Sequence, residues 1–146
     1  MPKWIPLFTN LLPCWGFGGL FVYAGFLKLW GLGPMSFAND IRSFHILADP
    51  WVAWLAMSLP WLEIFCGLAV ICGPLRRGGL IVLNVSLLIF LGALISALAR
   101  GIEISCGCFG HEGAASSTKS LIQRDLWLLA LGGWLLWVFF RKRIPA

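Results

Sequence analysis

Four long apolar runs dominate the pattern of hydrophobic and polar positions along the chain. They cover residues 11–30, 51–72, 79–99 and 121–140. Crossing the hydrocarbon core of a bilayer takes about 20 apolar residues in a helix that rises about 1.5 Å per residue. In lipid, only helices and closed barrels satisfy the backbone, and these runs are too long for barrel strands. The sequence therefore predicts an all-α integral membrane protein with four antiparallel helices in one bundle.

The first run follows Lys3 in the manner of a secretory signal, but it differs from one in two ways. It is too long for a signal core, and it lacks a convincing small-residue cleavage site. We therefore expect it in the mature protein. Since no internal repeat or polar linker divides the chain, residues 1–146 are expected to form a single transmembrane domain.

The segments between the apolar runs differ in character. Residues 31–50 place five apolar side chains among polar ones, which favours a short amphipathic helix lying against the membrane surface. These side chains are Phe37, Ile41, Phe44, Ile46 and Leu47. Residues 101–120 instead carry two closely spaced cysteines and then a run of small and polar residues.

Composition agrees with a membrane protein and suggests its orientation. The chain is 60% hydrophobic and 12% charged, with nine tryptophans and a formal charge of +5. In a membrane protein such a charge reflects basic residues on the cytoplasmic side rather than a nucleic-acid partner. The end with both termini carries basic residues and no acids, which predicts that the termini are cytoplasmic and that the cysteine loop, residues 101–120, is periplasmic. The basic residues at that end are Lys3, Arg76, Arg77, Arg141, Lys142 and Arg143.

Cys106 and Cys108, with Gly107 between them, are the strongest candidates for chemistry. A disulfide that closes so short a loop stabilises a fold by only about 1.5 kcal/mol, against roughly 4.7 kcal/mol for a hundred-residue loop. Strain makes such a bond easier to reduce, and Gly107 lets the backbone bend tightly enough to form it. The spacing therefore favours a redox-active pair of catalytic cysteines over a structural brace.

Alternatives for this segment stay open. Inert thiols or a passive bridge would leave Cys106 and Cys108 without redox chemistry, and His111 with Glu112 could complete a zinc or copper site. The ligand spacing does not follow a standard zinc pattern, so no metal site is predicted. His111 serves more simply as a loop residue, or as a neighbouring cation that increases the thiolate fraction of the cysteines.

Three polar residues inside the first two spans are candidate site residues. An ionisable group such as Glu63 is costly within a bilayer and is a functional candidate by default. Lys28 is near the outer end of its span, about 15 Å from Glu63 along the helix axis at helical rise. Tyr23 lies at a better depth. We therefore expect a hydrogen bond between Tyr23 and Glu63, with Lys28 reaching Glu63 only if the helices are offset or tilted.

Arg124 and Asp125 begin the fourth span shortly after the cysteine loop. Asp125 is favourably placed near a helix N-terminus, and Arg124 can pair with it or with a lipid headgroup. Both residues could also shape the electrostatic field around the two thiols, and this supporting role is weighed against a purely structural one.

Three segments together resemble the MauE family of methylamine-utilisation membrane proteins, related to the DoxX-like four-helix group. They are Phe21-Val22-Tyr23-Ala24-Gly25-Phe26-Leu27-Lys28, Leu59-Pro60-Trp61-Leu62-Glu63 with Gly67, and Cys106-Gly107-Cys108-Phe109-Gly110 followed by Arg124-Asp125. The resemblance covers most of the chain, and its third segment is the most specific. It implies a bacterial inner-membrane protein that handles disulfides with a periplasmic thioredoxin-like partner.

Two functions follow as hypotheses. In the first, the chain is a membrane-embedded thiol–disulfide oxidoreductase, with a quinone as a candidate electron acceptor or donor in the lipid bilayer and no obligatory cofactor. In the second, it is a non-enzymatic membrane subunit or a carrier that passes a soft metal or sulfur species along Tyr23, Glu63 and the two thiols.

Overall fold

The computed structural model describes residues 5–31, 33–102 and 118–141, with side chains from residue 11 in the first range and from residue 119 in the last. The elements in these ranges are helices, and they come in the following order. They are α1 (Ile5–Phe26), the π-helical turn η1 (Leu27–Gly31), α2 (Pro34–Ser43), α3 (Asp49–Cys72), α4 (Arg76–Ala99) and α5 (Thr118–Arg141).

Four of these helical stretches are long and apolar enough to cross a membrane. They are Leu11–Gly31, Asp49–Cys72, Arg76–Ala99 and Lys119–Arg141. Each begins and ends within three residues of a predicted span, so the prediction of an all-α bundle with four membrane spans is confirmed. The chain is a multi-pass membrane protein.

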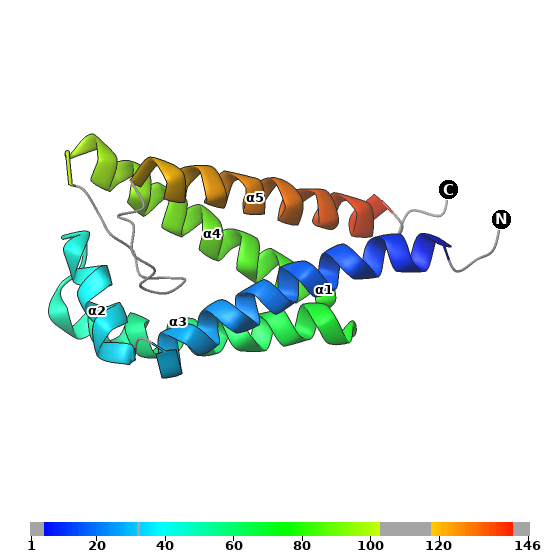
Figure 1. Cartoon of the computed structure of the whole chain (residues 1–146), viewed down its shortest axis with the longest axis horizontal. Helices are drawn as coiled ribbons and strands as arrows, with labels where there is room; N and C mark the ends of the chain where they lie inside the picture. Colours follow the sequence, from blue (N-terminus) through cyan, green and yellow to red (C-terminus); the bar gives the residue numbers. More distant parts are fainter. Residues whose placement is uncertain (1–4, 32, 103–117, 142–146) are drawn as a thin grey trace.

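The long helices are arranged as two antiparallel pairs, α1 with α3 and α4 with α5 (Figure 1). A short turn after Cys72 connects α3 to α4 and thereby joins the pairs at one end, which we call the turn end. Helix α1 begins and α5 finishes at this end. At the opposite end, called the α2 end, the two pairs lie farther apart and α2 packs alongside α3 (Figure 1).

Glycines bring α1 and α3 into close contact. A Cβ atom at Gly18 would lie 2.7 Å from the carbonyl oxygen of Gly67, and one at Gly25 would lie 2.7 Å from that of Pro60. Small residues at these positions let the backbones approach, which is how helices gain packing energy in lipid. The contacts also set the register, because a seven-residue step up α1 matches a seven-residue step down α3.

The predicted amphipathic helix is present as α2, and its apolar side faces the bundle. Phe37 and Phe44 are buried in a cluster with residues of α3, α4 and α5. Arg100, just beyond α4, donates a hydrogen bond of 2.7 Å from Nη2 to the carbonyl oxygen of Phe44. Ile46 and Leu47, which follow the helix, are exposed. Helix α2 is therefore a packed part of the bundle at this end.

Candidate functional site

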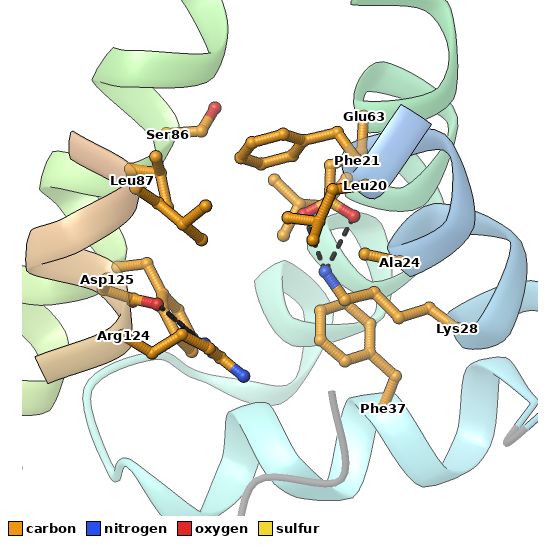
Figure 2. Close-up of a pocket in the computed structure, with 13 residues that line it drawn as sticks. Leu20, Phe21, Ala24, Lys28, Phe37, Glu63, Ser86, Leu87, Arg124 and Asp125 are labelled. Atoms are coloured by element: carbon orange, nitrogen blue, oxygen red, sulfur yellow. Dashed lines mark hydrogen bonds and ion pairs between the residues drawn. The ribbon is translucent and has the colours of Figure 1, made fainter. Parts of the chain in front are cut away.

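A pocket opens between the two helix pairs, on the side of the bundle nearer α2 (Figure 2). Its walls come from α1, η1, α2, α3, α4 and α5 and are mostly apolar, and they contain two ion pairs. The lining residues include Leu20, Phe21 and Lys28 of α1 and η1, Phe37 of α2, Glu63 of α3, Ser86 and Phe90 of α4, and Arg124 and Asp125 of α5.

The first ion pair joins Lys28 to Glu63. The Lys28 Nζ atom donates to both carboxylate oxygens, at 2.6 Å to Oε1 and 2.7 Å to Oε2. The two residues are only 6% and 7% exposed. Lys28 Nζ also lies 5.0 Å from the centre of the Phe37 ring, a favourable contact between a cation and an aromatic face. The charges are thus both paired and shielded by α2.

This pairing overturns the expected hydrogen bond between Tyr23 and Glu63. Tyr23 is 57% exposed on the outer surface of the bundle, because five residues separate it from Lys28 and turn it about 140° around the helix. Lys28 and Glu63 are closer along the helix axis than expected, because α1 and α3 are offset along that axis and their outer ends lie at different depths. Gly25 faces Pro60 and Glu63, so Lys28 lies roughly one helical turn beyond Glu63, a gap that a lysine side chain covers.

The second ion pair joins neighbours on α5. Arg124 donates to Oδ1 of Asp125 from Nη2 at 3.2 Å and from Nε at 3.3 Å. The Arg124 side chain is 33% exposed, whereas that of Asp125 is 1% exposed. Within the described part of the chain, Oδ2 of Asp125 is buried and has no hydrogen-bond partner. Of the two partners considered for Arg124, Asp125 and a lipid headgroup, Asp125 is in contact with it in the structure. The pair leaves one carboxylate oxygen of Asp125 without a partner among the described residues.

The two pairs face each other across the pocket (Figure 2). Lys28 comes from one helix pair, yet its charge also acts on Asp125 in the other. Among the described lining residues, the formal charges are two positive and two negative and sum to zero. The site is therefore a neutral pocket with strongly polar points at opposite sides and hydrocarbon between them.

The remaining predicted site residues fall outside the described ranges. Cys106, Gly107, Cys108 and His111 belong to residues 103–117. The chain leaves the described structure after Ile102 and re-enters it at Thr118, both at the α2 end. Arg124 and Asp125 lie near the start of α5, six and seven residues after Thr118.

A buried asparagine was missed by the sequence analysis. Asn84 of α4 donates from Nδ2 to the carbonyl oxygen of Leu80 at 2.7 Å, and its side chain packs on Gly132 of α5. A signal for it was present, because Asn84 belongs to the buried stripe that also contains Leu80, Leu87 and Leu91. The same kind of stripe, with Phe17, Phe21 and Ala24, points Lys28 inward.

Comparison with known proteins agrees with this architecture. The chain matches the family described as methylamine utilisation protein MauE over residues 6–138, which include the first three spans, the cysteine segment and most of the fourth span. Searches of curated proteins and of solved structures found no match. Because the family match covers nearly the whole chain, the chain belongs to the family of the methylamine utilisation protein MauE.

Proposed function

We propose that this protein is a membrane-embedded thiol–disulfide oxidoreductase of the bacterial inner membrane. The observation that carries the proposal is the Cys106-Gly107-Cys108 motif, because a disulfide in so small a ring is a weak brace and is easily reduced. The match to the MauE family, which includes this motif, supports the membrane setting of the proposal.

The proposed reaction is a dithiol–disulfide exchange with a periplasmic thioredoxin-like partner. A thiolate of the reduced partner attacks one sulfur of the Cys106–Cys108 disulfide, and the other sulfur leaves as a thiolate. A second partner thiolate then attacks the mixed disulfide. The partner ends as a disulfide and the protein as a dithiol, with two electrons transferred. The reverse sequence of the same steps reduces the partner.

Orientation belongs to the proposal as well. We place the turn end in the cytoplasm, with both chain termini, because Arg76, Arg77 and Arg141 lie there without an acidic neighbour in the sequence. Residues 101–120 then belong to the periplasmic side, where thiols are oxidised. Arg124 and Asp125 support the cysteines from the start of α5.

The alternative function, a carrier for a soft metal or sulfur species, receives less support. Its polar path ran through Tyr23 and Glu63 to the thiols. Tyr23 faces away from the bundle interior and Glu63 is held by Lys28, so that path loses its first member.

Trapping of the mixed disulfide tests the proposed function. Cys108→Ser and Cys106→Ser variants are expressed in the native host, and covalent adducts are identified by mass spectrometry under non-reducing conditions. At least one single variant is expected to trap a thioredoxin-like protein, since the second cysteine is no longer there to resolve the intermediate.

The matched control is Cys72→Ser, which removes an exposed thiol at the turn end and should trap nothing. The double variant Cys106→Ser/Cys108→Ser should also trap nothing. Failure of both single variants to trap a partner, with host activity preserved, would rule out the redox function.

A further inference from the structure

The unsatisfied oxygen of Asp125 indicates a missing hydrogen-bond donor. Asp125 is 1% exposed, and its Oδ2 atom has no partner among the described residues. Buried polar atoms in folded proteins are almost always hydrogen-bonded, and an ionisable group within a membrane span usually marks a functional site. Because Asp125 lines the pocket, a donor in the pocket would satisfy it.

The charge around the pocket restricts the donor to a neutral molecule. Glu63 and Asp125 are each already compensated by a neighbouring cation, so a bound cation would leave excess positive charge. An anion would meet the unsatisfied carboxylate oxygen directly. Among the described residues, no three His, Cys, Asp or Glu side chains cluster to hold a metal ion.

The apolar walls indicate what the body of this molecule is like. Phe21 of α1 and Phe37 of α2 supply aromatic rings (Figure 2). Phe90 of α4 supplies a third ring, and leucines form most of the remaining wall. Leu20, which also lines the pocket, is 36% exposed on the lipid-facing surface. A ligand that is flat, apolar and soluble in the bilayer can therefore reach the pocket from the side.

Lys28 supplies the complementary donor. Its ammonium group carries three N–H bonds, of which Glu63 takes two. The third can donate to a carbonyl oxygen in the pocket. The pocket thus has an acceptor, Oδ2 of Asp125, on one side and a donor, Lys28, on the other. This arrangement suits a ring that carries two oxygen atoms at opposite positions.

We propose that the pocket between the Lys28–Glu63 and Arg124–Asp125 pairs binds the head group of a lipid-soluble para-quinone and of its quinol. A quinol hydroxyl donates to Oδ2 of Asp125, and Lys28 donates to the oxygen across the ring. This inference rests on the proposed function and deepens it, since the site would hold the membrane-side redox partner of the Cys106 and Cys108 thiols.

The chemistry balances with the quinone as oxidant. The dithiol loses two electrons and two protons and becomes a disulfide with a new S–S bond. The quinone gains the two electrons and two protons and becomes a quinol with two O–H bonds. Asp125 is assigned as the acceptor of a quinol hydroxyl hydrogen bond.

Equilibrium binding tests the site directly. The full chain in lipid nanodiscs is titrated with decylubiquinone and, separately, with decylubiquinol. Isothermal titration calorimetry measures the binding of each. The unaltered protein and the Cys106→Ser/Cys108→Ser variant are both expected to show saturable binding with equal affinity, because the site does not require the thiols.

Two variants then probe the pocket from opposite walls. Asp125→Asn should weaken quinol binding about tenfold, since a hydrogen bond to a charged group is lost, and should change quinone binding much less. Ser86→Phe fills the pocket from α4 and should weaken binding of both probes. The matched controls are Asp49→Asn, in an exposed ion pair with Arg42, and Ser96→Phe, at an exposed position of α4; neither should change binding.

The outcomes separate this inference from the proposed function. Absence of saturable binding, or equal binding by every variant, overturns the quinone site even where mixed disulfides are trapped. Binding that responds to Asp125 and Ser86 supports the site even where no partner is trapped, in which case the thiol function alone fails. Thermal unfolding of each variant verifies that it is folded.

Discussion

Among individual residues, Lys28 and Glu63 carry a large desolvation cost, because both are charged and buried. Two charges lie within membrane-spanning helices, and the Lys28 ammonium contacts both oxygens of Glu63. Removing charged groups from water costs several kcal/mol each, and only close pairing offsets that cost. The pair is therefore stable as a unit, whereas either charge alone is destabilising.

Glu63→Gln should reduce the free energy of unfolding by about 3–5 kcal/mol, because it leaves the Lys28 ammonium buried without a counter-charge. The double variant Lys28→Met/Glu63→Gln should recover most of this loss, since no charge remains. Denaturant unfolding in mixed micelles measures both values.

The control for this comparison is Asp49→Asn, which breaks the exposed pair with Arg42. It should cost less than about 1 kcal/mol, as exposed ion pairs do. A Glu63→Gln variant no less stable than Asp49→Asn would show that the buried pair does not contribute as argued.

At the scale of elements, backbone contact between α1 and α3 positions the site. Gly25 meets the carbonyl oxygen of Pro60 and the Cβ atom of Glu63, so the depth of Lys28 relative to Glu63 depends on this contact. Pushing the helices apart would lengthen the distance that the Lys28 side chain has to span.

Gly25→Ala should destabilise the protein by about 1–3 kcal/mol, because the added methyl group would lie 2.7 Å from a backbone oxygen that cannot rotate away. Gly16→Ala on the same helix is the matched control, since a Cβ atom there meets nothing within 4 Å. The control should be neutral or slightly stabilising, because alanine favours helix over glycine. Thermal unfolding in detergent compares them, and equal stabilities would contradict the close contact.

Arg100, just beyond α4, tethers the backbone at the end of α2. Arg100→Gln removes the hydrogen bond to the Phe44 carbonyl oxygen, worth about 1 kcal/mol. Amide hydrogen exchange in residues 34–44 should then accelerate about fivefold. Lys119→Gln, an exposed change at the same end of the bundle, should leave these rates unaltered. Unchanged exchange in Arg100→Gln would mean that packing of Phe37 and Phe44 alone holds α2.

At the scale of the whole molecule, the two ends of the bundle have different roles. The turn end carries the basic clusters, while the α2 end carries the wider separation of helix pairs, the pocket and the ends of the cysteine segment. The proposed function requires the α2 end to face the periplasm. It therefore predicts the orientation of the whole protein in the membrane.

Labelling of single cysteines checks sidedness. In a background with Cys14, Cys66, Cys106 and Cys108 changed to serine, Cys72 at the turn end should react with a membrane-impermeant maleimide only after the cells are permeabilised. With Cys72 also replaced, Ala99→Cys at the α2 end should react in cells whose inner membrane is intact. The reverse pattern would invert the topology and place the cysteine segment in the cytoplasm.

The four spans and α2 are predictable from local stretches of the sequence. Span length and apolar composition are local properties, so the ends of the four membrane spans are predicted to within three residues, and the spacing of Phe37, Ile41 and Phe44 predicts α2. Arg124 and Asp125 are neighbours in the chain, so their pairing was also within reach of sequence reasoning. The Cys106 and Cys108 motif is likewise a feature of the sequence alone.

Only the tertiary structure decided the partner of Glu63. The sequence places Tyr23 near the depth of Glu63 and Lys28 about 15 Å away along the helix axis, and the choice between them depends on helix rotation and on the offset between α1 and α3. That offset comes from contacts of Gly18 with Gly67 and of Gly25 with Pro60, residues far apart in the chain. The two ion pairs lie at one pocket for the same reason: they are on helices that are distant in the chain, and only the packing of those helices brings them together.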